Sequence, residues 1–257
     1  FSYRNTMEAF PNVCDPLGAG YVNSNESSTI QLHINISASD SNGQQLFKIS
    51  NTTVGTGEML KKAFMGLGPT AKETSGFMRD RILLSDLHHR HLGQLKRKTV
   101  TGNAPAMYMG FADKAKPEKV LVVQAVKGDN EKVSAAHACV MIYLFLDSGE
   151  NLPVGKAEGN WNNHEMTVEL KVHENHVPWF IAAGAVKQTE QLDGWIKKRG
   201  KKGHGSRYET AGTISPGEDN GTLSVTVAPN VDKSFMVLLV TALVHMYEDA
   251  KHDIASC

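Results

Sequence analysis

The densest group of chemically active side chains in this sequence is basic. In the segment WIKKRGKKGHGSRY, five cations fall within six residues, at Lys197, Lys198, Arg199, Lys201 and Lys202. Basic side chains near an anionic membrane surface each contribute roughly 1 kcal/mol of attraction. Trp195 precedes the cluster and has the amphipathic ring that suits a membrane–water interface. The segment is therefore a candidate binding site for anionic phospholipid head groups, and the other interpretation is a solvated loop without a ligand.

The basic cluster makes the charge of the chain uneven. The sequence has 27 basic and 27 acidic side chains, so the remainder outside the cluster carries a formal charge of −5. A neutral total gives no general reason to expect nucleic acid as a partner. A second basic group, Lys96, Arg97 and Lys98, lies in a strand-like run, where alternation directs Lys96 and Lys98 to one face. We add these two lysines to the candidate lipid-binding residues.

The segment HHRH suggests a metal site, because imidazole suits Zn, Cu or Ni. It contains His88, His89 and His91, and Asp86 is the nearby carboxylate. Three histidines in one turn rarely converge on a single ion, and no cysteine stands near them to complete a shell. We therefore expect no metal and no cofactor.

The sequence offers no recognisable catalytic machinery. It contains no GxSxG segment, and HGSRY at 204–208 lacks the second glycine of a nucleophile elbow. GTGEMLKK at 55–62 lacks the GK[ST] ending of a P-loop. We expect a non-enzymatic protein. A hydrolase or metal enzyme would require a pocket in which the scattered histidines meet carboxylates.

Cysteine usage and glycosylation sequons point to different compartments. Cys14, Cys139 and Cys257 form an odd, dispersed set without CxxC spacing, which is typical of reduced thiols in a cytoplasmic protein. The chain begins at Phe1 instead of Met. Its N-x-S/T sequons stand at Asn25, Asn35, Asn51 and Asn220. We expect a cytoplasmic protein that is peripheral to membranes, with secretion as the alternative.

The elements that position these residues are mainly strands. STIQLHINIS alternates strictly from Ile30 to Ser37, an Asn-Gly turn follows at 40–43, and QLFKIS returns as the hairpin partner. Further strand-like runs lie at 81–86, 92–98, 106–112, 120–126, 138–145, 166–172, 179–186, 208–214 and 223–228. About a dozen short strands without interleaved helices indicate one antiparallel sandwich or barrel. We expect an irregular N-terminal arm over 1–27 and a single domain over 28–253.

The segment DKSFMVLLVTALVHMYEDAKHD predicts a helix over about 232–250 that has no polar face. Its apolar part, from Phe235 to Tyr247, must be buried either in protein or in lipid. Thirteen helical residues extend roughly 20 Å, whereas the bilayer core is about 30 Å thick. Asn230 or Asp232 can cap the start, and Glu248, Asp249 and Lys251 are expected to end the helix. We expect no transmembrane span and place the helix inside a closed barrel; a membrane anchor is the competing interpretation.

Three segments resemble the LURP-one-related proteins: LLSDLHHRHLGQLKRK, YMG and GTLSVTVAPNVDKSFMVLLVTALVHMYED. These proteins belong to the superfamily of the tubby C-terminal domain and the phospholipid scramblases. The resemblance extends from roughly Tyr21 to Ala250. It implies a tubby C-terminal-like fold, a closed antiparallel barrel of about twelve strands around a buried apolar C-terminal helix. It also implies phosphoinositide or phospholipid interaction, and a defence- or signalling-related role.

The sequence departs from the scramblase pattern. Before the helix, GEDNGTLSVTV offers Glu218 and Asp219 without the alternating carboxylates that a Ca²⁺ shell needs, and the cysteine-rich palmitoylation stretch is absent. We expect a non-enzymatic barrel module that binds anionic phospholipid or a protein partner. The alternatives are a secreted carrier or effector-like barrel, and a scramblase-like lipid mover without a recognisable calcium site.

Overall fold

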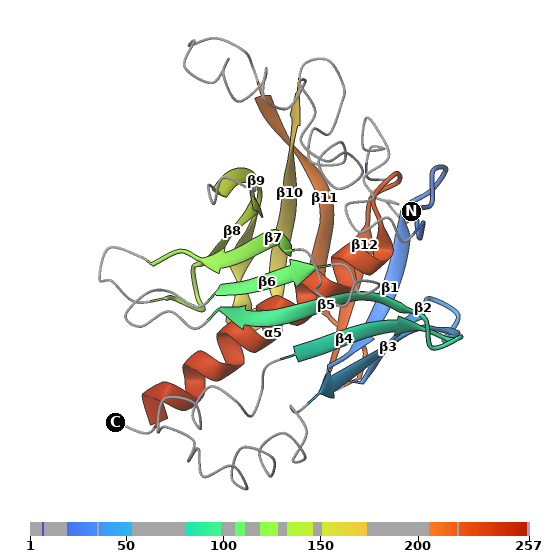
Figure 1. Cartoon of the computed structure of the whole chain (residues 1–257), viewed down its shortest axis with the longest axis horizontal. Coiled ribbons are helices and arrows are strands. Elements are labelled where there is room, and N and C mark those ends of the chain that lie inside the picture. The colour runs from blue at the N-terminus through green and yellow to red at the C-terminus, as the bar shows by residue number, and fades with distance from the viewer. Residues whose placement is uncertain are drawn as a thin grey trace, which may run out of the picture.

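In the computed structural model, twelve antiparallel strands close into a barrel around a C-terminal helix (Figure 1). The structure describes residues 7, 20–34, 36–52, 81–98, 106–110, 119–127, 133–145, 151–173, 206–219 and 221–255. Within these ranges the strands follow chain order around the barrel, and pairing of the first with the last closes it. The expected fold, a closed antiparallel barrel around a buried C-terminal helix, is confirmed.

The strands are β1 (Ser28–His33), β2 (Ser37–Asp40), β3 (Gln45–Thr52), β4 (Arg81–Asp86), β5 (His91–Lys98), β6 (Ala106–Gly110), β7 (Lys119–Ala125), β8 (Ala138–Phe145), β9 (Asn151–Asn160), β10 (Glu165–His173), β11 (Ser206–Pro216) and β12 (Thr222–Val227). A short 3-10 helix, η1 (Trp161–Asn163), joins β9 to β10, and the central helix is α5 (Lys233–Ala255).

The antiparallel order gives the barrel two distinct rims. Consecutive strands run in opposite directions, so alternate connections lie at the same rim. One rim carries the β2–β3 and β4–β5 turns and the start of α5, and we call it the helix-entry rim. The other carries the β1–β2 and β11–β12 turns, and we call it the opposite rim. The helix runs through the barrel from the first rim toward the second (Figure 1).

The barrel interior is packed with apolar side chains from the helix and the strands. From Phe235 to Val244, each residue of α5 is at most 2 % exposed, on all sides of the helix. The helix packs against β5, β6, β7 and β12, and Gly212 of β11 permits a close approach, because a Cβ there would lie 2.5 Å from Met236 Cε. Burial inside the barrel therefore explains why the helix has no polar face.

Among the described residues, no helix combines the length and the apolar character needed to cross a bilayer.

Asp232 caps the start of α5. Its Oδ1 atom accepts hydrogen bonds from the backbone N–H groups of Ser234 (2.6 Å) and Phe235 (3.1 Å), and also from the Ser234 hydroxyl. These bonds satisfy helix donors that would otherwise be buried without partners. At the other end the helix continues to Ala255, past the point near 250 that the charges predicted. Charged side chains are compatible with helical backbone, so they do not end the helix.

The observed strands differ from the prediction in two places, first at STIQLHINIS and then at β9. The run STIQLHINIS is not one strand, because a turn in which Ile36 N–H donates to the His33 carbonyl (3.0 Å) separates β1 from β2. Ile36 is consequently 67 % exposed. The Asn-Gly turn is confirmed, and it joins β2 to β3. The predicted run at 179–186 lies outside the described residues.

β9 was not predicted, because Pro153, Gly155 and Gly159 are unusual within a strand. Pro153 lies at the irregularity where the β8–β9 register shifts, a position at which a missing N–H is tolerated. A Cβ on Gly155 would lie 2.7 Å from the Glu169 carbonyl oxygen of β10. Glycine is therefore required there by the close approach of the neighbouring strand.

We expect Leu239→Ala to lower the free energy of unfolding by about 2–5 kcal/mol, because it leaves a cavity between helix and barrel wall. Chemical denaturation followed by circular dichroism measures this change. Ile36→Ala, which truncates an exposed side chain, serves as the control and should change stability by less than about 0.5 kcal/mol. Similar effects of the two substitutions would contradict the central position of the helix.

Candidate functional site

The main predicted site falls in a connection that leaves and returns at the helix-entry rim. Lys197, Lys198, Arg199, Lys201, Lys202 and Trp195 all lie outside the described residues. The strands on either side are described: β10 ends at His173 and β11 begins at Ser206, and these two residues pair with each other. Because β10 runs in the same direction as β4, its end belongs to the rim that holds the β4–β5 turn and the start of α5.

The second predicted basic pair lies on β5. Lys96 is exposed and pairs across the sheet with Arg81 of β4 and Tyr108 of β6. The backbone of Lys98 pairs with that of Ala106 of β6. The structure thus brings Lys96 next to Arg81, a basic neighbour that sequence reasoning did not include.

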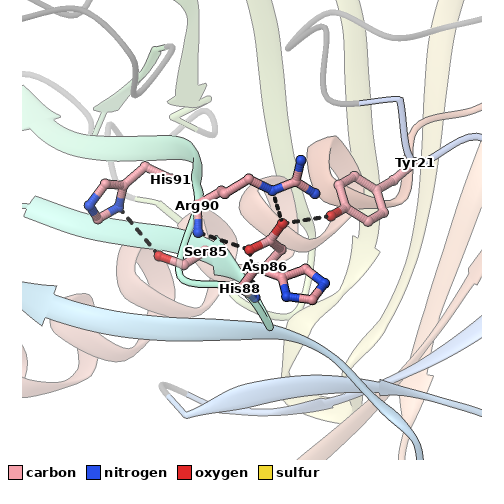
Figure 2. A network of polar contacts seen from close by, with 6 residues as sticks. All are labelled: Tyr21, Ser85, Asp86, His88, Arg90 and His91. Atoms are coloured by element: carbon pink, nitrogen blue, oxygen red, sulfur yellow. Dashed lines mark hydrogen bonds and ion pairs between the residues drawn. The ribbon is translucent and has the colours of Figure 1, made fainter.

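A polar network surrounds Asp86, at the β4–β5 turn (Figure 2). The Asp86 side chain is 3 % exposed. Its Oδ1 accepts from the backbone N–H groups of His88 (2.9 Å) and Arg90 (2.9 Å). Its Oδ2 accepts from Arg90 Nε (2.6 Å) and from the Tyr21 hydroxyl (3.3 Å). One carboxylate therefore fixes the backbone of the turn and the side chains on both sides of it.

These contacts shift three pKa values. Burial acts to raise the pKa of Asp86, but the hydrogen bonds from the Arg90 and His88 backbones and from the Arg90 side chain outweigh it and hold that pKa below its usual value. The hydrogen bond to Asp86 raises the pKa of Arg90. Burial, followed by the negative charge of Asp86, raises the pKa of Tyr21. Asp86 and Arg90 are consequently an ion pair at neutral pH.

Tyr21 connects this turn to the start of the helix. Its carbonyl accepts from the Lys233 N–H (3.0 Å), and its ring packs edge-on against Phe47 of β3 at 5.0 Å between centroids. The adjacent Val22 forms a β-bridge with Asp232, the helix cap. The β4–β5 turn, β3 and the helix start are therefore held together at one rim.

Sequence reasoning missed this network. Asp86 was considered only as a metal ligand, and Tyr21 was assigned to the irregular arm. One local signal was available: an aspartate that directly precedes a tight turn commonly accepts hydrogen bonds from backbone N–H groups two and four residues later. The partnership with Tyr21, 65 residues away, has no sequence signature.

The three histidines of the turn do not converge. His88, His89 and His91 are all exposed, and His89 adopts a left-handed conformation with φ of 60°. His91 Nδ1 lies 3.3 Å from Ser85 Oγ, and its ring points away from that of His88 (Figure 2). Within the described ranges, no group of three or more His, Cys, Asp or Glu side chains is placed to hold a metal ion. The imidazoles of His88 and His91 therefore point to different sides of the turn.

A second charged cluster lies on the outer face of β8, β9 and β10. Lys156 Nζ contacts Glu158 (2.7 Å) and Glu169 (3.1 Å), and hydrogen bonds to these carboxylates raise the pKa of Lys156. Cys139 Sγ lies 3.6 Å from Glu158, and burial followed by the charge of Glu158 raises the pKa of this thiol. The cation is already neutralised and the thiol is kept protonated, so this cluster favours neither anion binding nor nucleophilic chemistry.

Comparison with known proteins adds little to this picture. No family model matches the chain, and no curated protein matches it. An X-ray structure of a protein from Arabidopsis thaliana is similar with a TM-score of 0.49 at 15% sequence identity, over 91% of this chain and 98% of that chain.

We expect Asp86→Asn to lower the thermal unfolding temperature at pH 7, because a neutral amide cannot form the ion pair with Arg90. The stabilisation from the carboxylate is complete above the ordinary aspartate pKa of about 3.9 and is lost as pH falls through the lower pKa of the folded protein. The wild-type and variant unfolding temperatures should therefore converge in acid. Thermal unfolding between pH 7 and pH 3 measures this convergence.

The matched control is Asp219→Asn, which alters an exposed carboxyl group in the β11–β12 turn. It should leave the pH profile unchanged. A constant difference between wild type and Asp86→Asn across this pH range would show that the Asp86 charge does not stabilise the fold.

Proposed function

We propose that this protein is a non-enzymatic module that binds anionic phospholipid head groups of the phosphoinositide type at its helix-entry rim. The observation that carries this proposal is the filling of the barrel interior by α5. Strand and helix side chains occupy the space where a carrier barrel would hold its ligand. Recognition therefore falls to the outer surface and the rims, which counts against the carrier alternative.

The distribution of basic residues favours the helix-entry rim. The cluster of five cations lies in the connection between β10 and β11, both of which meet this rim, while the rest of the chain carries a net negative charge. Anionic lipid head groups suit such a cluster, because each basic residue close to the membrane adds roughly 1 kcal/mol of attraction. Lys96 and its cross-strand register partner Arg81 lie at the ends of β5 and β4 remote from the β4–β5 turn, toward the opposite rim, so they do not add to the basic charge of the helix-entry rim.

The resemblance to LURP-one-related, tubby C-terminal and scramblase proteins supports the same ligand class. The β11–β12 turn gives no support to calcium-triggered lipid scrambling. Glu218 and Asp219 are exposed there, and the Asp219 carbonyl accepts from the Thr222 hydroxyl at 2.6 Å, which closes the turn. The following strand then alternates Leu223 and Val225 inward with Ser224 and Thr226 outward. We therefore propose a peripheral, cytoplasmic lipid-binding protein, with a protein partner as the second candidate.

Flotation with liposomes tests the proposal. We expect binding to phosphatidylcholine vesicles that contain phosphatidylinositol bisphosphate, and weaker binding at physiological salt than at low salt, because salt screens exposed charges. Reversal of Lys197, Lys198, Lys201 and Lys202 to Glu should reduce binding at least tenfold, since roughly 1 kcal/mol is lost for each lysine.

The control is Lys127→Glu, which reverses an exposed charge that follows β7 at the opposite rim. It should bind nearly as well as the wild type. Equal binding by the quadruple variant would exclude the basic cluster as the contact. A wild-type protein that floats with no vesicle would overturn the lipid proposal and direct attention to protein partners.

A further inference from the structure

The β4–β5 turn presents an exposed leucine at the helix-entry rim. Leu87, the first residue of this turn, is 49 % exposed. Among the described residues, the other exposed large apolar side chains are Ile36, Val126 and Tyr208. Ile36 and Val126 lie at the opposite rim, and Tyr208 lies on β11 beside Lys156. Leu87 is thus the exposed aliphatic side chain that shares a rim with the start of the helix.

The neighbours of Leu87 within the turn are basic or amphipathic. His88, His89 and Arg90 follow it directly, and all three are exposed. The one carboxylate of the turn, Asp86, is 3 % exposed and directed inward to its hydrogen bonds. The outer surface of the turn therefore combines an apolar side chain with hydrogen-bond donors and carries no exposed carboxylate. This combination suits the interface between lipid tails and phosphate groups.

Arg90 is held in a fixed orientation while remaining accessible. Its side chain is 71 % exposed, although its Nε donates to Asp86 at 2.6 Å. A guanidinium has a planar set of donors that matches phosphate geometry. Asp86 offsets much of the charge of Arg90, so the contribution of Arg90 is directional hydrogen bonding more than long-range attraction. The basic cluster between β10 and β11 would supply the long-range attraction.

The turn is also rigid enough to enter a membrane interface without reorganising. Two backbone bonds, from Asp86 N–H to the Arg90 carbonyl (3.0 Å) and from His89 N–H to the Asp86 carbonyl (3.1 Å), close it. The Asp86 carboxylate adds two more bonds to the turn backbone, and its contact with Tyr21 connects the turn to the start of α5. A preorganised contact loses little conformational entropy on binding.

We propose that Leu87 inserts into the interfacial layer of an anionic phospholipid membrane while Arg90 and the neighbouring imidazoles contact lipid phosphates. The β4–β5 turn would then orient the barrel with its helix-entry rim against the membrane. This inference rests on the proposed lipid-binding function and identifies a second contact, distinct from the basic cluster. An apolar pocket on a protein partner is the competing occupant for Leu87.

The test compares Leu87→Ser with Ile36→Ser, which removes an even more exposed aliphatic side chain from the opposite rim. Both variants are floated with phosphatidylcholine vesicles containing phosphatidylserine and phosphatidylinositol bisphosphate. Leu87→Ser should reduce binding by about tenfold, the effect of withdrawing one leucine side chain from the interface. Ile36→Ser should bind within about twofold of the wild type, because a side chain at the opposite rim stays in water.

A second measurement reports insertion directly. An environment-sensitive fluorophore is attached at Leu87→Cys or at Ile36→Cys, in a chain where Cys14, Cys139 and Cys257 are replaced by Ser. Vesicles should shift the emission to the blue at position 87 and leave it unchanged at position 36.

The outcomes separate the two proposals. Wild-type flotation that is insensitive to Leu87→Ser, or the lack of an emission shift at position 87, overturns the insertion and leaves lipid binding to the basic cluster. Failure of the wild type to float with any of these vesicles overturns both proposals together.

Discussion

The whole structure depends on one constraint: an apolar helix without a polar face must be surrounded completely. Ten consecutive residues of α5, Phe235–Val244, are at most 2 % exposed, so apolar groups must meet every side of the helix. A single sheet face would cover such a helix only in part. A closed barrel covers it fully and leaves no sheet edge open to other chains. Barrel and helix are therefore mutually dependent, because the helix also fills an interior that the strands alone would leave empty.

Because α5 fills the barrel interior, the surfaces open to a ligand are the outer face and the rims. At the helix-entry rim, side chains from segments far apart in the sequence are connected by hydrogen bonds. Asp232 caps the helix, Val22 bridges to Asp232, and Tyr21 reaches from this segment to Asp86 of the β4–β5 turn. Two buried carboxylates thus fix the rim, one through helix N–H groups and one through a turn and an ion pair. Such a rim can present Leu87 and Arg90 in one orientation.

Periodicity in the sequence predicted most of the strands, and the helix without a polar face favoured a closed barrel around it. Period-two runs such as RILLSD and LSVTVA became β4 and β12, and the apolar helix became the centre of the barrel. The prediction from the sequence failed where local pattern and tertiary packing disagree. β9 carries Pro153 and Gly155 because of a register shift and a close strand neighbour, and neither is visible in the sequence. The run from Ile30 to Ser37 kept its alternation through a turn, so the sequence could not show where β1 ends and β2 begins.

For the candidate site, too, some features could be predicted from the sequence and others required the tertiary structure. The sequence by itself determined which residues are basic and that their charge is concentrated, because charge is a property of the residue and needs no fold. It also predicted that Lys96 and Lys98 share one strand face, since alternation is local, whereas the exposure of Lys96 came from the structure. Only the tertiary structure decided that Tyr21 and Asp86, 65 residues apart, would meet, and that the rings of His88 and His91 would point away from each other. Hydrogen bonds and exposure depend on which strands become neighbours, and the closure of the barrel around its helix sets that arrangement.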